Sequence, residues 1–332
     1  MATLDIFSGS AFQLRSLTEN INKIPPQFSY LLSQEGLFKE SGCSNKVVMI
    51  EERENVLQLI PNSNRGTNGT AIPREKRKVR AFSIPHKQVN DEILADQVQG
   101  VRMFGSETEA ETVASVVADR LQQAADSMQL TLEAMCVGAV KGEVLDADES
   151  VITNMFDEFE QKQHSEKWNI SEVGNVKKRC NHLVRRTIQT LGGTPVREFH
   201  ILCGDDIFDA IETSEELREA NKWRNNSDFL VDSHAYRYFE YAGVRFVNYQ
   251  GYVGDKQFIP AGEAYLLPIG VPGLFTINYA PADYTETVNT VGIKYYAKQE
   301  RMPFDKGIWL ECQTNPLVLC TRPAALCKIT LA

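Results

Sequence analysis

Long apolar runs and targeting signals are missing from this chain of 332 residues. No stretch approaches the roughly 18 consecutive apolar residues that a membrane-spanning helix needs. Residues 1–15 also lack the positively charged start and the apolar centre of a secretory signal peptide. We therefore expect a cytosolic protein that makes no membrane contact.

Paired cysteines are missing as well. The seven cysteines are odd in number and scattered, with no close pair among them: Cys43, Cys136, Cys180, Cys203, Cys312, Cys320 and Cys327. This pattern indicates neither a disulfide framework nor a zinc site. The acidic stretch 142–160 lacks the regular spacing and the turn glycine of a calcium loop. The sequence predicts no metal site and no cofactor.

Familiar catalytic motifs are also absent: there is no glycine-rich phosphate loop, no Gly-x-Ser-x-Gly elbow and no His-Glu-x-x-His pair. The strand candidate 198–203 carries the one cluster with catalytic residue types, namely His200, Cys203, Asp205 and Asp206. On an extended strand His200 and Cys203 point to opposite faces and cannot touch. The sequence thus predicts a protein that is not an enzyme, and a cytosolic enzyme with a Cys203 nucleophile stays as an alternative.

The composition is that of ordinary globular protein, with 42% hydrophobic and 24% charged residues. A chain of this length is expected to form about two domains. The net charge of −9 argues against a surface that binds nucleic acid throughout, because phosphate neutralisation needs a dense basic patch. Any basic surface must therefore be local.

One long amphipathic helix is predicted over residues 106–141. Its apolar positions alternate in steps of three and four residues: Val113, Val117, Leu121, Ala124, Met128, Leu132, Met135 and Ala139. Ser106 and Glu109 have the spacing of a capping box, and Gly142 suits a helix end. At about 1.5 Å per residue such a helix measures roughly 54 Å, which predicts a strut with other layers packed against it.

Residues 47–85 predict a long β-hairpin, since two strand-like stretches flank dense turn signals at residues 61–69. The returning strand carries a basic run: Arg74, Lys76, Arg77, Lys78 and Arg80. Acidic residues follow it, namely Glu107, Glu109 and Glu111. Opposite charge blocks indicate contacts between copies, although a solvated loop face or a nucleic-acid contact stays open. An isolated two-stranded ribbon is marginal in water, so the hairpin needs a partner surface.

The remaining chain alternates helices and short strands. Residues 1–45 predict an arm, or else the first elements of an ordinary domain, and residues 161–170 predict a linker. Helices are expected at 171–191, after Gly204 and around 214–222. Strands are expected at 198–203, 238–241, 244–249, 265–267, 274–277, 292–296, 307–312, 317–320 and 325–331.

The segment Gly243 to Glu300 resembles the corresponding part of the lambda-type tailed-phage major capsid protein E family. Its most specific part runs from APADY at residues 280–284 to YYAK at residues 295–298. The carboxyl end, Asn315 to Ala332, is also similar to that family. The order of elements resembles it over essentially the whole chain.

The resemblance implies an α+β protein with the Hong Kong 97-type phage capsid fold. Its parts would be an N-terminal arm at 1–45, an extended loop at 46–92, a peripheral domain at 93–172 and 285–332 with spine helix 106–141, and an axial domain at 173–284. The arm and the loop would reach over neighbouring subunits, and the axial domain would line the five- and six-fold centres.

The implied function is that of a major capsid protein that self-assembles into the icosahedral shell of a phage head. Hexamers and pentamers would enclose double-stranded DNA without sequence-specific binding, after assembly in the host cytoplasm. A scaffold protein and a portal are the implied partners, and a decoration protein is allowed. Because no long helical prefix precedes the arm, we expect a separate scaffold and maturation by rearrangement alone. An encapsulin-like compartment that encloses cargo enzymes is an alternative with the same fold.

Overall fold

Helix α4 (Val113–Lys141) is an unbroken helix of 29 residues. The computed structural model describes residues 18, 21, 29–53, 77–98, 113–170, 172–222, 231–232, 237–254 and 256–332. Residues 106–112 of the predicted helix therefore lie outside the described residues. The apolar stripe is confirmed from Val117 to Leu132, where exposed residues alternate with buried ones, whereas every residue from Met135 to Val140 is buried.

The helix ends where the sequence predicts, at Lys141 followed by Gly142. Gly142 has a φ of +89°, in the left-handed region that favours glycine. A Cβ atom there would lie 2.1 Å from the Cε2 atom of Phe156. Glycine is required at this position both for the turn and for the close approach of the aromatic ring.

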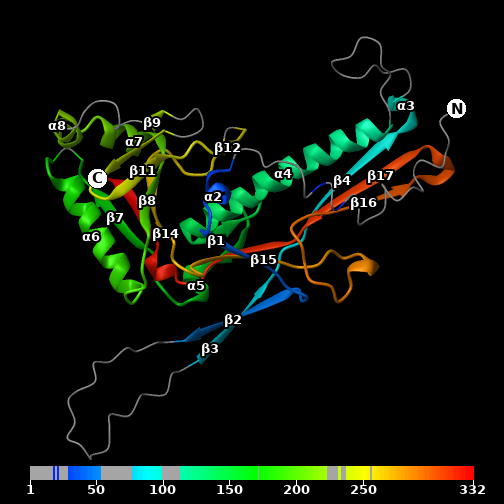
Figure 1. Cartoon of the computed structure of the whole chain (residues 1–332), viewed down its shortest axis with the longest axis horizontal. Coiled ribbons are helices and arrows are strands. Elements are labelled where there is room, and N and C mark those ends of the chain that lie inside the picture. Colours follow the sequence, from blue (N-terminus) through cyan, green and yellow to red (C-terminus); the bar gives the residue numbers. More distant parts are fainter. Residues whose placement is uncertain are drawn as a thin grey trace, which may run out of the picture.

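The first half of α4 packs on a three-stranded antiparallel sheet in the order β16 (Tyr296–Arg301), β17 (Gly307–Thr314) and β4 (Lys87–Leu94). Figure 1 shows the helix running along these strands. Ile93, Ile308 and Leu310 are buried with Val117 and Leu121 of the helix in one apolar cluster. Helix α3 (Ala95–Val98) follows β4, and the 3₁₀ turn η4 (Pro303–Asp305) joins β16 to β17.

The strand predicted at 292–296 is wrong, because β16 begins only at Tyr296. The amide of Ile293 donates to the Tyr296 hydroxyl at 3.0 Å, and the amide of Gly292 donates to the Cys43 carbonyl at 2.9 Å. These local and arm contacts satisfy the backbone that a ladder would otherwise pair.

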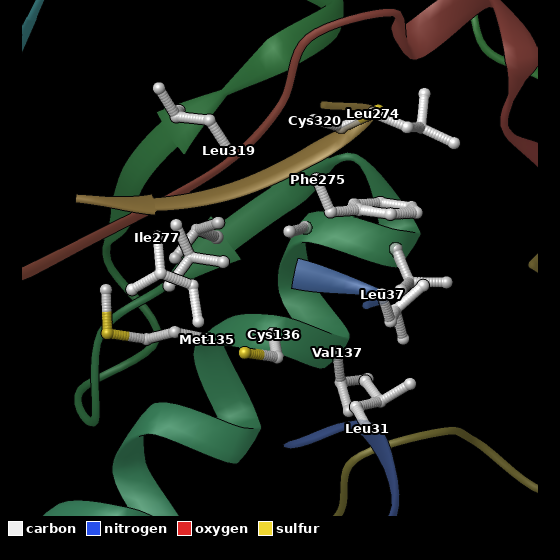
Figure 2. Close-up of a cluster of buried hydrophobic side chains, with 14 of the residues drawn as sticks. Leu31, Leu37, Met135, Cys136, Val137, Leu274, Phe275, Ile277, Leu319 and Cys320 are labelled. Carbon is white, nitrogen blue, oxygen red and sulfur yellow. The ribbon is translucent and has the colours of Figure 1, made fainter. Parts of the chain in front are cut away.

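The second half of α4 packs on another three-stranded sheet, in the order β1 (Phe38–Gly42), β15 (Phe275–Tyr279) and β18 (Pro316–Cys320). Strand β1 pairs with β15 in parallel, whereas β18 pairs with β15 antiparallel. Figure 2 shows Met135 and Val137 of the helix among Leu37, Phe275 and Ile277 in this core. The hairpin β5 (Glu143–Leu145) and β6 (Val151–Asn154) and helix α5 (Met155–Glu158) follow α4.

The third large sheet has seven strands. Its order is β7 (His164–Trp168), β19 (Cys327–Leu331), β14 (Glu263–Ile269), β8 (Glu198–Cys203), β11 (Val244–Asn248), β10 (Arg237–Tyr241) and β9 (Val231–Asp232). The predicted strand β8 and the predicted hairpin β10–β11 are confirmed. The linker predicted at 161–170 is wrong, because β7 pairs in parallel with β19 inside this sheet.

Two strands of this sheet, β7 and β19, come from outside the 173–284 segment expected for the axial domain. Strand β15 lies inside that segment yet belongs to the sheet on α4. Sheet membership therefore crosses the expected boundaries, because β19 pairs antiparallel with β14, and β18 with β15, across long distances in sequence.

Three helices cover one face of the seven-stranded sheet: α6 (Asn175–Thr190), α7 (Asp205–Glu212) and α8 (Glu215–Lys222). Their buried residues join those of the strands in one cluster, which includes Cys180, Ile207, Phe208 and Leu217. The helix predicted at 171–191 is confirmed over residues 175–190. The short strands β12 (Tyr252–Val253) and β13 (Lys256–Gln257) form a separate pair.

The predicted hairpin is confirmed where the structure describes it, since β2 (Val47–Arg53) pairs antiparallel with β3 (Arg77–Ser83). Figure 1 shows this ribbon projecting away from the three larger sheets. The short helix α2 (Tyr30–Ser33) lies against α4. The 3₁₀ turns η3 (Thr285–Thr287) and η5 (Pro323–Ala325) complete the described elements. No helix in the described ranges is long and apolar enough to cross a membrane.

Candidate inter-subunit surfaces

The inner face of the hairpin is anchored to the rest of the chain. Phe82 is 4% exposed and stacks on Phe159, with the ring centroids 6.1 Å apart. The guanidinium of Arg80 lies over the same Phe159 ring, 5.0 Å from its centroid, and donates a hydrogen bond to the Glu158 carbonyl oxygen. Aromatic stacking and a cation–π contact therefore hold the base of the hairpin.

The predicted basic run is only partly described. Arg74 and Lys76 lie outside the described residues, and Arg77 is described as a backbone position in β3 alone. Lys78 forms an ion pair of 3.4 Å with Glu160, and both side chains are more than half exposed. Such a pair contributes little to stability. Lys78 and Arg80 thus each have a contact within their own chain.

The outer face of the hairpin is apolar and open. Val47 is 43% exposed, Met49 72% and Val79 58%. The strand register places Met49 opposite Ala81 and Val79 opposite Glu51, so these side chains share one face. Because exposing an apolar face costs hydration free energy, this face is a candidate interaction surface. The alternation of residues along 47–51 and 79–83 indicates that the hairpin has two different faces. Which of the two is exposed to solvent depends on the fold.

The predicted acidic partners Glu107, Glu109 and Glu111 lie outside the described residues. The structure instead gathers acidic side chains on the sheet β16–β17–β4. They line an open hollow of about 410 Å³ that is formed by Asn90, Asp91, Tyr284, Lys298, Gln299, Glu300, Trp309, Leu310 and Glu311. The Trp309 side chain is 45% exposed there. Sequence reasoning missed this hollow because Asn90 and Asp91 lie more than 190 positions from its other lining residues.

The charges of the hollow are mostly negative. Lys298, the one basic residue among the described residues that line it, forms an ion pair with Glu286 at 3.0 Å. Asp91 pairs with Arg120 of α4 at 3.3 Å. Burial and the neighbouring Glu311 raise the pKa of Tyr284 well above its ordinary value, so this hydroxyl stays neutral. The hollow therefore combines an exposed indole with carboxylates, which suits an apolar and basic partner.

A buried carboxylate ties the segment 29–33 to the rest of the chain. Glu133 of α4 is 1% exposed and accepts hydrogen bonds from the amides of Leu31 at 2.8 Å and Leu32 at 3.2 Å. The Tyr249 hydroxyl donates to the same carboxylate at 3.0 Å. Burial raises the pKa of Glu133, and the three donors oppose that shift. One side chain thus joins an N-terminal segment, the long helix and Tyr249, the residue that follows β11.

The His200 and Cys203 pair has no catalytic geometry. Cys203 is fully buried in the apolar cluster beneath α7, and burial raises the pKa of its thiol. His200 lies on the opposite face of β8, where its Nδ1 atom is 2.9 Å from the Tyr30 hydroxyl. Its Nε2 atom is 3.2 Å from Glu198. The two side chains therefore act as packing and hydrogen-bonding groups of the core.

Comparison with solved structures defines the class. A prophage protein of E. coli CFT073 is similar with a TM-score of 0.62, 14% identity and coverage of 97% of this chain and 99% of the other. The mature capsid of bacteriophage PhiM1 is similar with a TM-score of 0.53 and 12% identity, covering 92% and 88%. The SrpI encapsulin of Synechococcus elongatus gives 0.53 and 9%, covering 92% and 91%. The chain has the Hong Kong 97-type capsid fold, as predicted.

The family follows from the sequence comparisons. This chain belongs to the phage major capsid protein E family, whose model matches residues 13–331. The major capsid protein of Salmonella phage Felix O1 is 23% identical over 357 aligned positions, which cover 96% of each chain. That of Pseudomonas phage KPP10 is 24% identical, again with 96% of each chain covered. The predicted class, a structural protein of the virion capsid, is confirmed.

Proposed function

We propose that copies of this chain assemble into the icosahedral shell of a phage head in the host cytoplasm, from hexamers and pentamers. The shell encloses double-stranded DNA without sequence-specific binding. The net charge of −9 supports this, because bulk repulsion limits how tightly phosphates are held. A scaffold protein and a portal complete the assembly, and a decoration protein is compatible with it.

One observation carries the assembly proposal: the hairpin has an outer apolar face that no described part of its own chain covers. Met49, at the centre of this face, is 72% exposed. Burying such a face against another copy gains about 25 cal/mol for each Å² of apolar surface removed from water. A contact between different surfaces of successive copies then generates closed rings and shells.

We further propose that the hairpin of one copy docks in the acidic hollow of another. The hairpin offers the exposed apolar side chains of Val47, Met49 and Val79. The sequence of the same segment adds the basic residues Arg74, Lys76 and Arg77. The hollow offers the half-exposed indole of Trp309 with carboxylates around it. Glu107, Glu109 and Glu111 remain additional acidic candidates for this contact.

The domain assignment is likewise a proposal. The arm is assigned to residues 1–45, the extended loop to 46–92, the peripheral domain to 93–172 and 285–332, and the axial domain to 173–284. The sheet order supports two adjustments. Strands β7 and β19 are counted with the axial domain, because they belong to its seven-stranded sheet, and β15 is counted with the peripheral domain, because it pairs with β18.

Electron microscopy of the purified protein, alone and together with the products of neighbouring genes, tests the proposal. Closed shells or capsomer rings are the expected result. A purely monomeric protein under all assembly conditions would refute the assignment to shells. Particles loaded with a protein cargo and no DNA would favour the encapsulin-like alternative.

The hairpin is tested with Met49→Glu and Arg77→Glu together. Arg80 is left in place, because its contacts with Phe159 hold the hairpin base and its loss would disturb the fold. The expected result is a folded chain with strongly reduced particle yield. A matched control is Val151→Glu on β6, where the valine is 54% exposed. Wild-type yield from the double variant would contradict docking through the hairpin.

A further inference from the structure

Helices α6 and α7 carry opposite charge. Between Asn175 and Thr190 helix α6 has five basic residues and no acidic one: Lys177, Lys178, Arg179, Arg185 and Arg186. Between Asp205 and Glu212 helix α7 has four acidic residues and no basic one: Asp205, Asp206, Asp209 and Glu212. The chain as a whole has a net charge of −9, so the concentration of basic residues on α6 is not explained by the overall composition.

The charges near the body of the protein have partners within the chain. Arg179 lies 3.7 Å from Glu166, and Arg186 donates to the Ala324 carbonyl at 3.3 Å. On α7, Glu212 accepts from Arg237 at 3.0 Å and Asp205 accepts from Gln257 at 3.1 Å. These inner groups therefore do not require a second molecule.

The outward charges do not have such partners. Lys178 and Arg185 are exposed along one side of α6, seven residues apart, and Asp206 and Asp209 are exposed along α7. Among the residues that the structure describes, none of these four forms an ion pair. Ile188, 40% exposed, adds an apolar side chain to the end of the basic side. We call Lys178, Arg185 and Ile188 the basic stripe, and Asp206 and Asp209 the acidic stripe.

The two stripes lie over different strands of one sheet, the basic stripe at one edge and the acidic stripe near the middle. Helix α6 contacts β7 at the edge of the seven-stranded sheet, whereas α7 contacts β11 and β14. Figure 1 shows α6 and α7 as two separate helices beside the seven-stranded sheet. Buried Glu216 of α8 ties the start of α6 to β10, because it accepts from the amides of Val176 and Lys177 at 3.1 and 3.0 Å and from the Tyr241 hydroxyl at 2.8 Å.

We propose that the basic stripe of one copy faces the acidic stripe of the next copy around each capsomer ring. This inference rests on the proposed shell function and names the contact that gives the ring its direction. Like stripes repel, so a two-fold contact of α6 with α6 is disfavoured. Complementary stripes at different positions on one chain instead favour a head-to-tail contact, which closes into rings. A nucleic-acid partner for the basic stripe would leave the acidic stripe without a role.

Charge exchange tests the contact. The basic reversal carries Lys178→Glu and Arg185→Glu, and the acidic reversal carries Asp206→Lys and Asp209→Lys. Each should lower the yield of rings and shells by about tenfold, because two attractive exposed pairs become repulsive. The fourfold variant with all four changes should return to within about twofold of the wild type, since complementarity is restored.

A mixture of the two reversals gives a sharper result. In a ring that alternates the two variants, every contact again joins opposite charges, and this is possible only for an even number of subunits. Six-membered rings should therefore recover in the mixture, while five-membered rings retain one repulsive contact. Native mass spectrometry and electron microscopy distinguish the two ring sizes.

The controls separate failure of this contact from failure to fold. Circular dichroism and thermal melting of each reversal should match the wild type, because all four side chains are exposed. The matched variant Lys162→Glu with Lys167→Glu reverses two exposed charges near β7 and should assemble normally. Wild-type assembly of either reversal, or no recovery in the fourfold variant, would overturn the inference. If the wild type itself forms no shells or rings, the proposed function fails instead.

Discussion

Replacing Glu133 by alanine should release the segment 29–33 from α4. The change leaves the buried amide of Leu31, the partly buried amide of Leu32 and the buried Tyr249 hydroxyl without their acceptor. Each buried donor left unpaired costs about 1–3 kcal/mol. Relief from burying a carboxylate offsets part of this sum. We therefore expect a loss of about 2–5 kcal/mol in the free energy of unfolding.

The contribution of the Glu133 carboxyl group to folding stability should decrease as the pH rises. Burial holds the pKa of Glu133 in the folded chain above its ordinary value of 4.5. Below pH 4.5 the carboxyl group is protonated in both states, and its contribution to stability is fully present. As the pH rises through the folded pKa, that contribution is lost, because only the unfolded state ionises freely. Glu133→Gln cannot ionise, so wild type should lose stability relative to this variant as the pH rises above 4.5.

Urea unfolding of Glu133→Ala, Glu133→Gln and wild type at several pH values measures both effects. Tyr249→Phe is the matched control, because it removes one donor and leaves the two amide bonds to Glu133 in place. Limited proteolysis reports whether the segment 29–33 detaches. An unchanged unfolding midpoint for Glu133→Ala would refute the assignment of Glu133 as the anchor.

Three further predictions concern other contacts. Gly138→Ala should destabilise the fold by about 1–3 kcal/mol in thermal melts, because its Cβ would lie 2.9 Å from the Glu143 carbonyl; Gly262→Ala, with open space around it, should be neutral. Phe159→Ala should accelerate proteolytic cleavage of the hairpin through loss of its aromatic anchor, and equal cleavage rates would contradict this. Burial lowers the pKa of His200, so the contribution of the neutral imidazole to folding stability is present above pH 6.5 and is lost as the pH falls. Thermal melts at pH 7.5 and 5.5 should therefore show a smaller drop in melting temperature for His200→Asn than for wild type.

Much of the fold could be predicted because its local patterns are strong. The apolar stripe of α4 and the turn at Ala242 and Gly243 each depend on a few neighbouring residues. Strand β7 escaped prediction because its inward positions are Glu166 and Trp168, and a buried glutamate does not look like a strand interior. His182 and Arg179 from α6 compensate Glu166, which the sequence of β7 alone cannot reveal.

The candidate surfaces were less predictable than the elements. The basic run could be predicted because its residues are contiguous. The ion pair between Lys78 and Glu160 could not, since the two residues lie 82 positions apart. The acidic hollow depends on the register of β17 between β16 and β4. Pairing between distant strands sets that register, and a single sequence carries little information about it.

The division of α4 between two cores has a mechanical consequence. Val117 to Met128 belong to the cluster with β4, β16 and β17, whereas Leu132 to Val140 belong to the cluster with β1, β15 and β18. Since the clusters share no residue, a gentle bend of the helix between Met128 and Leu132 would keep the apolar contacts within each cluster. Long helices bend gently at small cost. One subunit could then adopt the slightly different curvatures that a closed surface demands.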